Sequence, residues 1–132
     1  MESRYLTKDG YVMSAQTIYL DQSRKYLAAA AEEFDRGELG EASGHGWGAA
    51  VTIVKAVAEE RGWPHDTVRD LFRVVNRLVD ELKAPEARMQ FQLASSLHTN
   101  FYESWLERPY VRDSLAHVAR FVARLEELLT YR

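Results

Sequence analysis

The chain has 132 residues, of which 46% are hydrophobic and 28% are charged, and its formal net charge is −3. This balance is typical of one globular domain with a single hydrophobic core. The negative charge gives no overall attraction to nucleic acid, so any contact with RNA would need a local patch. Cysteine is absent, which excludes disulfides, thiolate zinc sites and a cysteine nucleophile.

The N-terminal segment 1–13 is the part of the chain with the weakest pattern. Lys8, Asp9 and Gly10 form a turn signal between two short apolar pieces, which suits a loose arm or a weak hairpin. We expect a loose arm. The segment lacks the apolar stretch of a secretion signal, and no apolar run approaches the roughly 20 residues that span a bilayer. We therefore expect a cytoplasmic protein with no membrane contact.

The next part of the sequence predicts two long helices. Apolar residues recur at helical spacing over 14–36, and Gly37 then suits the left-handed conformation that ends a helix. A second helix is predicted over 39–60, ended by Gly62. Because the link at Gly37 is so short, the two helices should be antiparallel neighbours.

The third predicted helix has the most regular apolar stripe. This stripe runs from Val68 to Leu82 at i, i+3, i+4 spacing, and we expect His65 or Asp66 to cap the helix. Arginines also recur on its polar side, at Arg69, Arg73 and Arg77. A row of guanidinium groups could track phosphates, but the nearby carboxylates favour an ordinary solvated face.

Two further helices complete the prediction. The fourth begins at Pro85 and runs to about Glu107, and the fifth begins at Pro109. The fifth carries a heptad seam suited to packing lengthwise along other helices, formed by Val111, Leu115, Val118, Val122, Leu125 and Leu129. The sequence therefore predicts an all-α fold, an antiparallel up-and-down bundle of about five helices in one domain over 1–132.

A row of glycines lies near the start of the second helix. Gly40, Gly44 and Gly48 fall on one side of it, where another backbone, a partner subunit or a ligand can approach closely. The segment lacks the Gly-Lys-Ser/Thr ending of a phosphate loop, so close helix packing is the simplest interpretation. Glu41 and His45 could share a metal, but no third ligand stands at a recognisable spacing. We expect a surface Glu–His pair, with no metal and no cofactor.

The fourth helix carries the most suggestive side chains. His98 sits at the edge of its apolar face, beside Phe91, Tyr102 and Trp105. Such a histidine could form a partly buried site in which its pKa is tuned for acid–base work. A hydrogen-bonded structural histidine is the alternative.

Several segments together resemble a known family. They are the run Glu33-Phe-Asp-Arg-Gly-Glu-Leu-Gly-Glu-Ala42, the runs 47–50, 54–56 and 62–65, and the run Leu97-His-Thr-Asn-Phe-Tyr-Glu103. Over roughly residues 20–130 the chain resembles the small PaREP-type prokaryotic proteins of the HEPN superfamily (higher eukaryotes and prokaryotes nucleotide-binding). The resemblance implies a helical bundle, often homodimeric, in a superfamily where many members are metal-independent ribonucleases and often toxins paired with antitoxins.

The ribonuclease signature implied by the resemblance is an arginine followed by a histidine after four to six intervening residues. Histidine would transfer protons and arginine would stabilise charge at the phosphate. Arg112 and His117 have this spacing. In a continuous helix, however, their side chains would point about 140° apart, and Leu115 between them belongs to the apolar seam. This geometry argues against catalysis.

The sequence therefore favours a non-catalytic homodimeric binding module in an RNA- or nucleotide-linked process. Either the glycine row or the fifth-helix heptad would form the dimer contact. The predicted ligand site comprises Trp47, His65, His98, Asn100 and Tyr102. Two alternatives stay open. One is a metal-independent endoribonuclease of the toxin–antitoxin type, with Arg112 and His117 as catalytic residues or with His98 and an arginine from elsewhere. The other is a structural partner of a nucleotidyltransferase-type antitoxin protein.

Overall fold

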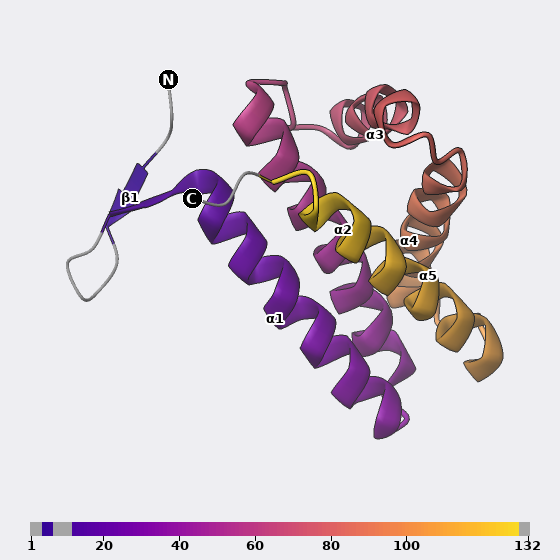
Figure 1. The fold of residues 1–132 in the computed structure, drawn as a ribbon. Helices are drawn as coiled ribbons and strands as arrows, with labels where there is room; N and C mark the ends of the chain where they lie inside the picture. The colour runs from indigo at the N-terminus through magenta and orange to yellow at the C-terminus, as the bar shows by residue number, and fades with distance from the viewer. Residues whose placement is uncertain (1–3, 7–11, 130–132) are drawn as a thin grey trace.

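The fold is a bundle of α-helices preceded by a short β-hairpin, seen in a computed structural model that describes residues 4–6 and 12–129. The helices in the described residues are α1 (Ala15–Asp35), α2 (Leu39–Arg61), α3 (Val68–Leu82), α4 (Glu86–Glu103) and α5 (Arg108–Glu126). α1 and α2 lie side by side and antiparallel (Figure 1). α2 is the central element, because it packs against each of the other helices. The predicted all-α bundle is confirmed.

The N-terminal segment forms a hairpin over its described residues. β1 (Arg4–Leu6) pairs antiparallel with β2 (Val12–Ser14), so that Arg4 stands opposite Ser14. The ribbon of β1 stands apart from the helical bundle in Figure 1. Of the loose arm and the weak hairpin that the sequence suggested, the described residues show the hairpin. The turn signal at 8–10 lies outside the described residues.

Helix ends in the first half of the chain follow local sequence. Gly37 and Gly62 adopt positive φ angles of 79° and 70°, the left-handed conformation expected after α1 and α2. The start of α3 differs from the prediction, because Thr67 is its N-cap. The Thr67 hydroxyl accepts from the Asp70 backbone N–H, and the Asp70 carboxylate accepts from the Thr67 N–H. This reciprocal capping box leaves His65 and Asp66 outside the helix.

The fourth and fifth helices meet at a tighter corner than the sequence suggested. α4 ends at Glu103, earlier than the predicted Glu107, and Ser104 takes a left-handed conformation with φ 50°. α5 then begins at Arg108, with Pro109 inside its first turn. Proline is accommodated there because the first-turn N–H groups have no partner within the helix.

The core lies around α2 and is filled by large apolar side chains from α2, α3, α4 and α5. Phe91, Phe121, Ile53, Leu78 and Leu97 are among its fully buried members. The heptad seam also lies here, since its α5 residues are buried except Leu115, which is partly buried, and Leu129 is buried just beyond the end of the helix. The seam therefore packs within the chain, and the alternative in which it forms a dimer contact is wrong.

Across the described helices, none is both long enough and apolar enough to cross a membrane.

Candidate ligand-binding groove

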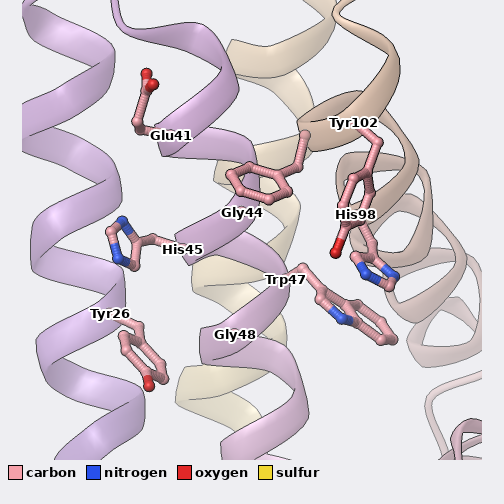
Figure 2. Close-up of a pocket in the computed structure, with 9 residues that line it drawn as sticks. Tyr26, Glu41, Gly44, His45, Trp47, Gly48, His98 and Tyr102 are labelled. Atoms are coloured by element: carbon pink, nitrogen blue, oxygen red, sulfur yellow. The ribbon is translucent and has the colours of Figure 1, made fainter.

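A groove of about 450 Å³ runs across the N-terminal half of α2, between side chains of α1 and α4 (Figure 2). Most of the residues that line it carry a ring. The lining consists of Tyr26, Glu41, Gly44, His45, Trp47, Gly48, His98, Phe101 and Tyr102. Figure 2 shows Tyr26 and His45 on one side of the α2 backbone and Trp47, His98 and Tyr102 on the other.

Glycine residues of α2 form the floor of the groove. A Cβ atom added at Gly44 would lie 2.8 Å from Cδ1 of Phe101, and one added at Gly48 would lie 3.0 Å from Cδ2 of Tyr26. The missing side chains therefore leave room for one ring from α4 and one from α1. Gly40 has no such neighbour, since nothing lies within 4 Å of its added Cβ. The close packing expected of the glycine row thus holds for Gly44 and Gly48.

The α4 side of the groove is a connected set of rings. His98 stacks on Trp47 with ring centroids 5.0 Å apart and planes 7° apart, and it meets Tyr102 edge to face at 5.5 Å. His98 and Tyr102 share a face of α4 because they are four residues apart. Neither ring nitrogen of His98 forms a hydrogen bond with another described residue, so both can reach solvent or a ligand. The structure thus brings together Trp47, His98 and Tyr102 of the predicted site.

The α1 side is built around His45. Its imidazole stacks against Tyr26, with centroids 5.6 Å apart, and a hydrogen bond of 2.6 Å joins its Nδ1 to Oε1 of Glu33. Because only 13% of the Glu33 side chain is exposed, this bond is shielded and fixes the imidazole. The partner of His45 is therefore Glu33 on α1, and the predicted surface pair with Glu41 is wrong. His45, Tyr26 and Phe101 were missed as site residues. The glycine row beside His45 was the signal that could have found them.

Asn100 serves the fold and does not line the groove. It is almost fully buried, its amide donates to the Ser43 hydroxyl at 3.0 Å, and its carbonyl accepts from the backbone N–H groups of Trp105 and Leu106 at 2.8 and 2.7 Å. These bonds fix the corner after α4 and tie it to α2.

His65 lies beyond the other end of α2. Its Nε2 bonds to Glu59 at 2.8 Å, and its ring meets Tyr19 edge to face. Glu59 is about 18 Å farther along the helix than Trp47, at about 1.5 Å per residue. The structure therefore does not bring His65 to the groove.

The sequence matches a known protein family. Its residues 18–122 match the archaeal PaREP1/PaREP8 family. The chain belongs to this family. The match begins within α1 and ends within α5, so it contains every residue that lines the groove. No curated protein matches the sequence.

In this PaREP1/PaREP8 protein the candidate catalytic pair does not converge. Arg112 and His117 both lie in the continuous helix α5. Arg112 pairs with its neighbour Asp113 and borders a separate apolar groove between α1 and α5. Nδ1 of His117 instead accepts from Arg120 at 3.2 Å and lies 3.5 Å from the side-chain nitrogen of Gln90 on α4. The side chains of Arg112 and His117 therefore lie against different parts of the molecule, as the helical pitch led us to expect.

The arginine row of α3 belongs to a different surface of the PaREP1/PaREP8 protein. Two guanidinium groups make cation–π contacts with the ring of Trp63. That of Arg77 lies 4.0 Å from the ring centroid and that of Arg61 lies 5.4 Å from it. Arg69 and Arg73 are exposed. None of these arginines lines the groove. No three histidine or acidic residues of the described chain gather closely enough to hold a metal ion.

Proposed function

We propose that the protein is a non-catalytic binding module whose groove holds a planar heterocycle, such as the base of a nucleotide or of single-stranded RNA. The observation that carries this proposal is the presence of rings on both sides of a glycine floor. Flat bases bind proteins mainly by stacking on aromatic side chains, which contributes about 1–3 kcal/mol per base. Among the large apolar residues whose exposure the structure describes, Tyr102 is the most exposed, with 72% of its surface accessible, so it is the groove ring most open to a base.

Two further considerations support a binding role. The divergence of Arg112 and His117 removes the arrangement through which the resemblance would imply catalysis. The resemblance to the HEPN superfamily also points to a nucleotide- or RNA-linked process. A homodimer is part of the same proposal, and it rests on that resemblance alone. Light scattering during size-exclusion chromatography would measure the mass in solution, and a monomer at all concentrations would contradict this part.

The experiment that tests the binding role compares two exposed tyrosines. We expect purified protein to bind nucleosides, nucleotides or a short single-stranded RNA in isothermal titration calorimetry. Tyr102→Ala should weaken the affinity about tenfold, because a stacking ring is lost. Tyr110→Ala is the matched control, since Tyr110 is similarly exposed at 62% but does not line the groove. If folded wild-type protein binds none of these ligands, the proposed function is wrong.

A metal-independent endoribonuclease is the second candidate. The observation that favours it is the position of two imidazoles, His45 and His98, on opposite sides of the same groove. A base and an acid placed in this way could serve RNA cleavage without a metal. The test is cleavage of RNA in EDTA by the wild type and by His45→Ala, His98→Ala and His117→Ala. Cleavage that disappears in either groove variant would replace the binding proposal with the enzyme.

A further inference from the structure

The charges around the groove are unusual for a site that would hold a nucleotide. Among the described residues that line it there is no lysine and no arginine. Phosphate groups are normally held by guanidinium or ammonium groups, or by the free N–H groups at the start of a helix. The first turn of α2 borders the groove, but it carries the carboxylate of Glu41. A phosphate placed there would meet a negative charge.

The histidines of the groove do not supply the positive charge that a phosphate would need. A positive charge on His45 would be neutralised by Glu33, whose carboxylate is joined to the ring at 2.6 Å. His98 is packed against the rings of Trp47 and Tyr102, with centroids 5.0 and 5.5 Å away. The groove therefore contains the carboxylate of Glu41 and, among its described lining residues, no lysine or arginine, while its walls are aromatic.

From this we infer that the groove takes the uncharged heterocycle of a nucleoside and excludes its phosphate. This inference rests on the proposed binding function and specifies the ligand of the same site. Carboxylate and imidazole groups on the walls suit the amino groups that bases carry, since a carboxylate accepts hydrogen bonds and donates none. The ligand is a free nucleoside, or a base of single-stranded RNA whose phosphates stay in the solvent outside the groove.

The test compares each nucleoside with its own phosphate. Adenosine and guanosine, their 5′-monophosphates and a short single-stranded RNA would be titrated at pH 8 in moderate salt. We expect each nucleoside to bind at least about fivefold more tightly than its monophosphate, because the phosphate dianion is repelled by Glu41 at short range. RNA binding tighter than that of the nucleosides would identify RNA as the source of the base. Weaker RNA binding would identify the free nucleoside. Both results support the inference.

Charge variants test the role of the groove directly. Glu41→Lys should abolish or reverse the preference for the nucleoside. Glu41→Gln should reduce the preference without placing a positive charge at the start of α2. Asp80→Lys is the matched control, because it changes the net charge equally on α3, which contributes no residue to the groove. We expect Asp80→Lys to keep the wild-type preference.

Two outcomes would overturn the inference and can be told apart from failure of the proposed function. If the monophosphates bind the wild type as tightly as the nucleosides do, phosphate exclusion is wrong and base binding stands. If Glu41→Lys and Asp80→Lys change the preference equally, the effect belongs to overall charge and the groove does not exclude phosphate. If folded wild type binds no base-containing ligand, the proposed function fails and the inference fails with it.

Discussion

The imidazole of His98 lies parallel to the indole of Trp47, with ring centroids 5.0 Å apart. The two residues come from α4 and α2, so their stack joins two helices as well as forming one side of the groove. Trp47 also contacts Phe91, a fully buried core residue, at a centroid distance of 5.5 Å. The position of His98 in the groove therefore depends on a ring that is anchored in the core.

Replacing Trp47 by leucine should loosen His98 and destabilise the fold. We expect Trp47→Leu to lower the free energy of unfolding by about 1–3 kcal/mol, because packing against Phe91 and His98 is lost. The ring C–H signals of His98 in the proton NMR spectrum should move downfield when the shielding by the indole disappears. Trp105→Leu is the control. Trp105 is 60% exposed, so its replacement should change stability by less than about 0.5 kcal/mol. Unchanged His98 signals in Trp47→Leu would contradict the stack.

Replacing Asn100 should affect stability and not ligand selection. Asn100→Ala would leave two backbone N–H groups at the α4–α5 corner without their acceptor, and the Ser43 hydroxyl would lose its donor. Unsatisfied buried groups cost about 1–3 kcal/mol each, so we expect a loss of about 2–4 kcal/mol in urea denaturation. Thr99→Ala, at the exposed neighbouring position, should have little effect. If Asn100→Ala keeps its stability but loses ligand binding, the role predicted from the sequence would be restored.

Local sequence was sufficient to predict most of the helices. The apolar stripe from Val68 to Leu82 gives both bounds of α3, and Gly37 and Gly62 mark the ends of α1 and α2 because their left-handed conformation is encoded at a single residue. The end of α4 was predicted too late for a different reason. The corner depends on Asn100, whose carbonyl accepts from the N–H groups of Trp105 and Leu106 and whose amide is held by a bond to a hydroxyl 57 positions away. No local pattern contains that contact.

The groove was predictable only in part. Trp47, His98 and Tyr102 were found because they lie in the segments that resemble the family, and His98 and Tyr102 also stand four residues apart beside aromatic side chains of α4. The α1 side was not found, because the bond between His45 and Glu33 depends on how α1 is rotated against α2. Asn100 and His65 were included for the same reason, because they too lie in segments that resemble the family. Such segments hold residues that shape the fold as well as residues that line a site.

The ion pair of Arg61 and Glu81 should make a small pH-dependent contribution to stability. Arg61 donates two hydrogen bonds to the Glu81 carboxylate, of 2.7 and 2.6 Å, and this lowers the pKa of Glu81 below its ordinary value of 4.5. A lowered pKa in the folded state stabilises the protein above the ordinary pKa, and this stabilisation is lost as the pH falls through the lowered pKa. Both side chains are partly exposed, so solvent screening keeps the effect at about 0.5 kcal/mol.

The measurement for this pair is urea denaturation of Glu81→Gln at pH 7 and near pH 3. We expect the variant to be less stable than the wild type at pH 7 and the difference to shrink at the lower pH. Asp80→Asn serves as the control, because Asp80 is an exposed neighbour on α3 and the substitution removes the same negative charge while leaving the bonds between Arg61 and Glu81 in place. A difference that is equal at both pH values would show that the ion pair is not its cause.

Replacement by alanine should have opposite effects on stability at two glycines of α2. A Cβ at Gly46 would lie 2.6 Å from Cδ2 of Leu115 and 3.1 Å from Cδ1 of Leu97, whereas a Cβ at Gly40 would meet nothing within 4 Å. Gly46→Ala should therefore lower the free energy of unfolding by about 1–2 kcal/mol, because two leucine side chains must move and Leu97 is fully buried. Gly40→Ala should raise it by up to about 1 kcal/mol, because alanine restricts the unfolded chain and favours the helix.

Urea denaturation of both variants measures this difference, and each acts as the control for the other because the chemical change and the helix are the same. Equal slopes of the free energy against urea would show that the unfolded states are comparable. If Gly46→Ala is as stable as Gly40→Ala, the partly exposed Leu115 can turn aside without cost. Close packing would then not be the reason for glycine at this position of α2.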